Sequence, residues 1–207
     1  MTLGLPELLA IAAGLGWASG LRLYAVLFLV GLAGHLGWVP LPGGLTLLAE
    51  PWMLILSGIF CVAEFLVDKV PWLDSAWDVV HTAIRIPAGA ALAAAAFGGD
   101  AGQWTTAAAL LGGSLAATSH AAKTTLRATA NTSPEPFSNW GLSLLGDAAV
   151  PAMLWLAFEH PFVFLPALAV AVVAMLAVTV LLWRAIRRLL AGLRERARTG
   201  AVVASPR

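Results

Sequence analysis

The chain has 207 residues, of which 60% are hydrophobic and 11% are charged, and its formal net charge is +1. A mean hydropathy of +0.86 lies far outside the range of soluble domains and predicts an integral membrane protein. The near-neutral charge gives no reason to expect a nucleic-acid partner. The lipid bilayer is therefore the first expected partner.

Six apolar segments are long enough to cross a hydrocarbon core, which needs about 20 residues per helix. They cover residues 5–34, 51–68, 79–98, 104–127, 140–158 and 161–183. The third and fourth segments carry charged residues, so five and seven crossings remain alternatives. We expect an all-α, polytopic bundle that forms a single domain over residues 1–190. A basic cytoplasmic tail with a disordered end is expected at 191–207.

The distribution of basic residues predicts the orientation in the membrane. With six crossings and an inner N-terminus, the outer connections lie near residues 35–50, 99–103 and 159–161, and they contain no Lys or Arg. Lys69, Lys123, Arg127 and the arginines from Arg184 onward then lie inside or near the inner surface, as the positive-inside rule requires. The first segment has no basic stretch before it and is too long for a cleaved signal peptide. We therefore expect both termini in the cytoplasm.

Charged residues concentrate in the stretch 64–87, between two apolar segments. Helical spacing places four of its polar residues on one face, because they are separated by four, three and four positions: Asp74, Asp78, His81 and Arg85. Glu64 and Asp68 form another pair, four residues apart, at the end of the preceding segment. The sequence predicts that these polar groups converge along two neighbouring helix faces.

Further polar residues lie inside the other segments. Arg22 interrupts a first segment rich in glycine, and an arginine at mid-helix costs about 2.5–3.5 kcal/mol unless it finds an acidic partner or a wet cavity. We therefore expect both Arg22 and Arg85 to pair with carboxylates drawn from Glu64, Asp68, Asp78 and Asp147. The predicted site for an ion or solute comprises Arg22, Glu64, Asp68, Asp74, Asp78, His81, Arg85, His120, Lys123, Arg127, Asn131, Asn139 and Asp147.

A weak internal similarity suggests two inverted repeats, residues 1–99 and 100–190. Pro40 and Pro42 precede Pro134 and Pro136 by 94 residues, and Gly20 precedes Ser114 by the same offset. Three helices in each half would invert the second half relative to the first, as in many transporters with broken helices. Coincidence in a chain rich in glycine and proline is the alternative. If the repeat is real, the first and fourth segments pack together around a polar cavity.

Several motifs carry a family resemblance. They are Glu64-Phe-Leu-Val-Asp-Lys-Val-Pro71, Asp74-Ser-Ala-Trp-Asp78, His81-Thr-Ala-Ile-Arg85 and Asn131-Thr-Ser-Pro-Glu-Pro-Phe-Ser-Asn139. Together they resemble the bacterial membrane-protein family known as domain of unknown function 4126. The resemblance covers nearly all of the chain up to about residue 180. It implies a multi-pass protein of the bacterial inner membrane and implies no particular activity.

Three functions fit these patterns. The first is a transporter or channel for an ion or small charged solute, with Glu64 as the preferred proton-coupling acid and Asp147 as the second choice. The second is a structural or partner-binding membrane protein whose charges form internal ion pairs. The third is an enzyme acting on lipid headgroups, with Asp74, Asp78 and His81 as metal ligands or as general acid and base.

The enzyme is the least favoured, because no recognised nucleophile or metal motif is present and Asp-x-x-x-Asp-x-x-His alone is weak. No cofactor is expected, and the pattern assigns no metal. The single cysteine, Cys61, excludes a disulfide within one chain. Assembly into a homo-oligomer remains open.

Overall fold

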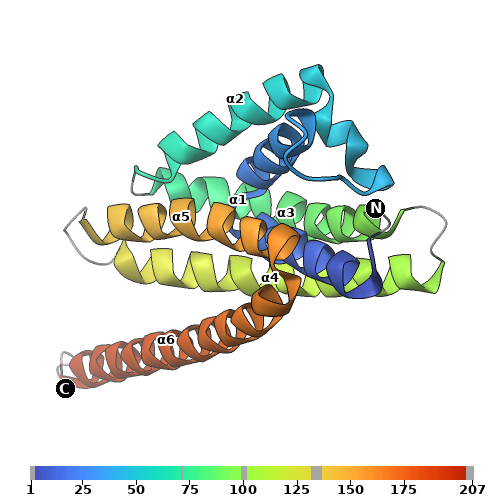
Figure 1. Ribbon diagram of the computed structural model, residues 1–207. Helices are drawn as coiled ribbons and strands as arrows, with labels where there is room; N and C mark the ends of the chain where they lie inside the picture. Colours follow the sequence, from blue (N-terminus) through green and yellow to red (C-terminus); the bar gives the residue numbers. More distant parts are fainter. Residues whose placement is uncertain (1–2, 71, 99–101, 132–136, 204–207) are drawn as a thin grey trace.

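The computed structural model describes residues 3–70, 72–98, 102–131 and 137–203. All regular elements in these ranges are helices: α1 (Leu5–His35), the short 3-10 helix η1 (Gly43–Ala49), α2 (Pro51–Val67), α3 (Leu73–Phe97), α4 (Gln103–Ala130), α5 (Phe137–Glu159) and α6 (Pro161–Val203). Each predicted apolar segment overlaps one of the six long helices. The all-α class is therefore confirmed (Figure 1).

Fewer than six of the described helices are both long and apolar enough to cross a membrane. Four qualify singly, namely α1, α3, α5 and the part of α6 up to Arg188. The pair η1 and α2 makes a fifth if this unit, which is bent by 71°, is one span. α4 does not qualify, because glycine, hydroxyl residues, histidine and charged residues lower its hydropathy. The apolar helices nevertheless suggest a multi-pass membrane protein.

α1 is broken at Arg22, whose φ of −148° and ψ of 82° are not helical. Before the break, Gly14 packs against Ala157 in the last turns of α5. Arg22 contacts Ser143 near the start of α5. After the break, Leu29 lines a cavity with the last turns of α5. The first half of α1 therefore enters the bundle from one end, and the second half returns toward that same end.

This re-entrant path changes the relation between the two ends of the chain. η1 lies against the end of α3, where Gly44 approaches Ala95. The helices α2 to α6 then alternate in direction, so that α6 ends at the opposite end of the bundle from the start of α1 (Figure 1). Six full crossings would have brought the two termini together. The predicted shared side for the termini therefore does not follow from this arrangement.

Small residues bring the first half of α1 close to α4, as the sequence predicted. Gly16 packs against Gly112, and Gly20 packs against the backbone of Ala116, so that a methyl group at either α1 glycine would overlap α4. Residue numbers rise together along this contact, so the two helices run in the same direction. An inverted repeat would make them antiparallel. In addition, α4 has no break, so the two glycine-marked helices are not equivalent.

Parts of the predicted repeat and tail lie outside the described residues. For the repeats these are 1–2, 71, 99–101 and 132–136, the last of which include Pro134 and Pro136, and for the tail they are the last four positions, 204–207. α6 continues to Val203, so the described part of the tail is helical.

Large apolar side chains cover the outer faces of α2 and α6. Among them, Ile59 and Val62 of α2 and Val170 and Val173 of α6 are each more than half exposed. Exposed apolar surfaces of this extent are typical of contact with lipid. Among the side chains of α6 whose burial the structure describes, those that are buried belong to its first turns, Phe164 and Leu168.

Overpacking the contact between α1 and α4 should destabilise the fold. Gly20→Leu places a large side chain against the backbone of Ala116, and we expect a loss of about 1–3 kcal/mol or more. The measurement is the unfolding midpoint of the purified protein in micelles. Gly141→Leu is the matched control, because Gly141 has no neighbour within 4 Å on its Cβ side. An equal loss in both variants would contradict this packing.

Candidate functional site

Charged side chains from five helices form one continuous series of ion pairs. In order of contact, the series is Asp147, Arg22, Asp68, Lys123, Asp78, Arg85 and Glu64. Acidic and basic groups alternate along it, so each inner member has neighbours of opposite charge. We call this set the ion-pair series. It runs from α5, through the break in α1, to α3 and α2.

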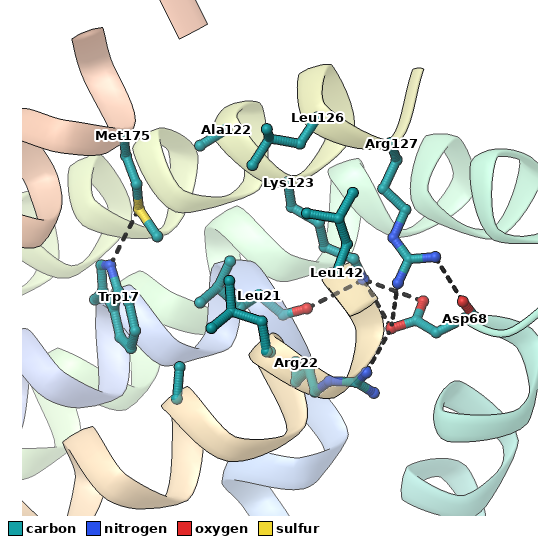
Figure 2. A pocket seen from close by; sticks show the side chains of 13 residues that line it. Trp17, Leu21, Arg22, Asp68, Ala122, Lys123, Leu126, Arg127, Leu142 and Met175 are labelled. Atoms are coloured by element: carbon teal, nitrogen blue, oxygen red, sulfur yellow. Dashed lines mark hydrogen bonds and ion pairs between the residues drawn. The ribbon is translucent and has the colours of Figure 1, made fainter. Parts of the chain in front are cut away.

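Asp68 is the centre of the series. It follows the last turn of α2, and its carboxylate is fully buried. Its oxygens lie 3.1 Å from Nη2 of Arg22, 3.2 Å from Nζ of Lys123 and 3.5 Å from Nη2 of Arg127. Figure 2 shows these three cations converging on the carboxylate from α1 and α4. One acid therefore joins three helices by charge.

The break in α1 positions Arg22 for this role. Besides Asp68, its Nη2 lies 2.9 Å from Oδ1 of Asp147 and donates to both the carbonyl and the hydroxyl of Ser143. The other oxygen of Asp147 lies 3.3 Å from Nζ of Lys69, whose ammonium also stacks over the ring of Phe65. Charge-assisted contacts of this kind offset the cost of placing a guanidinium in an apolar layer.

Lys123 occupies a cage of four oxygen atoms at the break. Its Nζ lies 3.2 Å from the carbonyl of Leu21, 3.2 and 3.3 Å from the two oxygens of Asp68, and 3.1 Å from Oδ1 of Asp78. The carbonyl of Leu21 is available because the helix stops being regular at Arg22. The last carbonyls of a helix carry partial negative charge. The cage therefore has the chemistry of a cation site, and the ammonium fills it.

The inner end of the series is centred on Arg85. Its Nη2 lies 2.6 Å from Glu64, and its Nη1 lies 2.5 Å from Asp78. All three side chains are almost completely buried. Oε2 of Glu64, Oδ2 of Asp78 and Nε of Arg85 have no hydrogen-bond partner among the described residues. Buried polar atoms of this kind usually bind water or a ligand.

His120 extends this inner end. The hydroxyl of Thr82 donates to the carbonyl of Asp78, and its oxygen lies 2.7 Å from Nε2 of His120. Nδ1 of His120 lies 3.4 Å from Nη1 of Arg85, a donor, and 3.3 Å from the carbonyl oxygen of Gly20, an acceptor. The imidazole therefore joins α3, α4 and the backbone of α1 at this point. A charged imidazole would bring a like charge against the guanidinium.

His81 lies apart from the ion-pair series. Its Nδ1 donates to the carbonyl of Trp77, its Nε2 accepts from the hydroxyl of Tyr24, and its ring stacks on Trp77. Asp74 and Asp78 are instead paired with cations of α3 and α4. The three predicted ligands of an enzyme centre therefore do not converge. Within the described ranges, no three His, Cys, Asp or Glu side chains are grouped to hold a metal ion.

A side branch leaves the series at the ends of α3, α4 and α5. Arg127 donates to Asp74 at 2.7 Å and to the backbone carbonyl of Asp68 at 2.6 Å. Asn131 donates to Asp74, and Asn139 donates to Asn131 at 2.6 Å. This branch ties the connection between α2 and α3 to the neighbouring helix ends.

Both arginine pairings predicted from the sequence are confirmed. Arg22 pairs with Asp68 and Asp147, and Arg85 pairs with Glu64 and Asp78. Among the described residues, His81 is the predicted site residue that contacts no other member of the predicted set.

Several polar residues that contact members of the predicted site were missing from it. They are Tyr24, Lys69, Thr82 and Ser143. Sequence offered a signal for two of them: Lys69 follows Asp68 directly, and Ser143 lies one helical turn before Asp147. Nothing in the pattern distinguished Thr82 from the other hydroxyl residues of the chain.

Comparison with known proteins gives a family. A family model described as "Domain of unknown function (DUF4126)" matches residues 9–184. The chain belongs to this family. No curated protein and no solved structure matches the chain. The matched region contains the whole ion-pair series, and the family description attaches no activity to it.

Arg85→Gln should destabilise the protein strongly. The change leaves Glu64 and Asp78 buried without their guanidinium partner, which typically costs about 3–5 kcal/mol. Chemical unfolding in mixed micelles measures the loss. Arg187→Gln, on the exposed face of α6, should change stability by less than about 0.5 kcal/mol.

A double-mutant cycle that combines Arg85→Gln with Glu64→Gln measures the coupling free energy between the two side chains, apart from the effect of each single change. The double variant should be more stable than the sum of the single losses predicts, by about 0.5–3 kcal/mol. Strict additivity would show that the contact contributes no coupling.

Proposed function

We propose that the protein is a small membrane transporter for a cation, and that the transported ion and the ammonium of Lys123 alternate at the same oxygen atoms. The observation that carries this proposal is the cage around Nζ at the break in α1. In many transporters, unwound carbonyls and half-helix C-termini coordinate the transported or coupling ion. Here a tethered cation of the protein itself occupies such a place.

The backbone supports a movement that would open the cage. Segment 23–70 is flanked by two irregular points, Arg22 and Trp72, and Trp72 has a φ of 72° that is rare for a bulky residue. Within this segment, Glu64 and Asp68 supply carboxylates to cations of the other helices. A shift of the segment would therefore exchange ion pairs and free the oxygens around Lys123.

A structural role is the second candidate, and the balance of charge favours it. Five carboxylates and five cations form the series and its branches, and each has a partner of opposite sign: Glu64, Asp68, Asp74, Asp78 and Asp147 with Arg22, Lys69, Arg85, Lys123 and Arg127. Such a network also fixes helix register without transport. Flux measurements distinguish the two.

Uptake of labelled cations into proteoliposomes tests transport. We expect saturable uptake of ²²Na⁺ or ⁸⁶Rb⁺, or proton movement reported by a trapped pH dye. Asp78→Asn should lower the rate at least about tenfold, because it removes a charge from the cage and from Arg85. Glu50→Gln, an exposed acid outside the network, should transport like the wild type.

A second measurement uses Lys123→Met. This variant vacates the cage, so Na⁺ or K⁺ should raise its unfolding midpoint, with about 2.7 kcal/mol of stabilisation at a hundred times the Kd. The wild type should respond less. If the folded protein showed neither cation uptake nor cation-dependent stabilisation, the transport proposal would be wrong and the structural role would be the better explanation.

The charges at the two ends of the bundle support an orientation in the membrane. Lys69, Arg127 and the arginines of α6 lie at one end, and the sequences near η1 and between α5 and α6 contain no Lys or Arg. We infer that the basic end faces the cytoplasm of a bacterial inner membrane. With the re-entrant α1, we then expect the N-terminus on the other side of the membrane from the C-terminal end of α6.

Single cysteines test this topology in a Cys61→Ser background. Gly4→Cys should react with a membrane-impermeant maleimide in intact spheroplasts, whereas Gly192→Cys should react only after lysis. Cys61→Ser alone is the unlabelled control. If both cysteines were protected until lysis, both termini would lie in the cytoplasm, as the prediction of six crossings requires.

A further inference from the structure

A cavity of about 210 Å³ lies beside the ion-pair series, between α1, α4, α5 and α6 (Figure 2). Most of its wall is apolar and includes Leu21, Leu126, Leu142 and Leu145. An apolar cavity of about 150 Å³ holds one benzene molecule. The volume here therefore suits a short length of a single alkyl chain.

One end of the cavity is cationic. Arg22, Lys123 and Arg127 line it together with a single carboxylate, that of Asp68. The hydrogen bonds from Arg22 to Ser143 and the ion-pair distances from Arg22 to Asp68 and Asp147 are all measured at Nη2, whereas the cavity lies beside Nε. Gly146 faces Nε, and a Cβ at this position would lie 3.4 Å from it. The glycine therefore keeps one edge of the guanidinium open to the cavity.

The rim of the cavity is apolar and exposed. α6 packs tightly only near its start, through Phe164 and Leu168, and then diverges from the bundle (Figure 1). Its contact with α1 in the cavity is a hydrogen bond from Nε1 of Trp17 to the sulfur of Met175, at 3.3 Å. Leu145, on the rim, is 65% exposed. A chain from the bilayer therefore meets an apolar entrance and a basic end.

We propose that this cavity binds a single-chain anionic amphiphile from the surrounding bilayer. Its carboxylate or phosphate group binds the free edge of Arg22 and the neighbouring Arg127, because guanidinium groups pair well with both anions. Its alkyl chain lies along the leucine wall and leaves past Leu145. This proposal goes beyond cation transport and does not depend on it, because the anion uses donors that the cage around Lys123 does not.

Photolabelling of the full-length protein in phosphatidylcholine nanodiscs tests the proposal. The probe is palmitate with a diazirine in its chain, and the comparison probe is hexadecanol with the same diazirine. We expect saturable labelling by the palmitate probe, with cross-links mapped to the leucine wall of the cavity. The alcohol should label these residues at least about threefold less, and excess inorganic phosphate should leave the labelling unchanged.

Two tryptophan substitutions on α5 provide a matched pair. Ala149→Trp fills the cavity and should lower palmitate labelling at least about tenfold, whereas Ala148→Trp, on the exposed face, should leave it unchanged. Gly146→Leu is a second blocking variant, used if Ala149→Trp does not fold. Equal labelling of blocked and wild-type protein would overturn the site. Equal labelling by the alcohol, or displacement by phosphate, would overturn the anionic amphiphile as its ligand.

Discussion

The architecture depends on one carboxylate. Asp68 neutralises cations from the broken part of α1 and from two turns of α4, and it lies directly after the last turn of α2. Without its charge, three cations would lie buried beside fewer acids, and breaking even one such pair costs about 3–5 kcal/mol. The position of α2, the bend in α1 and the cage around Lys123 therefore have a common cause.

The ion pairing was accessible from the sequence for a simple physical reason. In an apolar layer an arginine must find an acid, and few acids lie within the helices, so the partners of Arg22 and Arg85 came from a short set. Helical spacing then placed Asp74, Asp78 and Arg85 on one face, as the structure has them. Uncharged hydroxyl side chains such as Thr82 do not require a partner of opposite charge, so their contacts could not be predicted in this way.

The direction in which each helix runs through the bundle could not be predicted from the sequence in the same way. Hydropathy counts apolar residues, and the 31 residues of α1 satisfy that count whether the helix crosses the bilayer or turns back at Arg22. The proline spacing between the two halves suggested inversion, yet the contact of Gly16 with Gly112 joins helices that run the same way. α4 shows the converse: its neighbours satisfy its polar residues, so a helix inside the bundle need not be apolar.

The contact between the first half of α1 and α4 has a consequence for the order in which the fold is completed. Ser119 donates to the carbonyl of Trp17, and Lys123 donates to the carbonyl of Leu21. These donors lie 102 residues later in the chain than the carbonyls that they bind. The two contacts can therefore form only after α4 has been synthesised, so the first helix made is completed by one of the later ones.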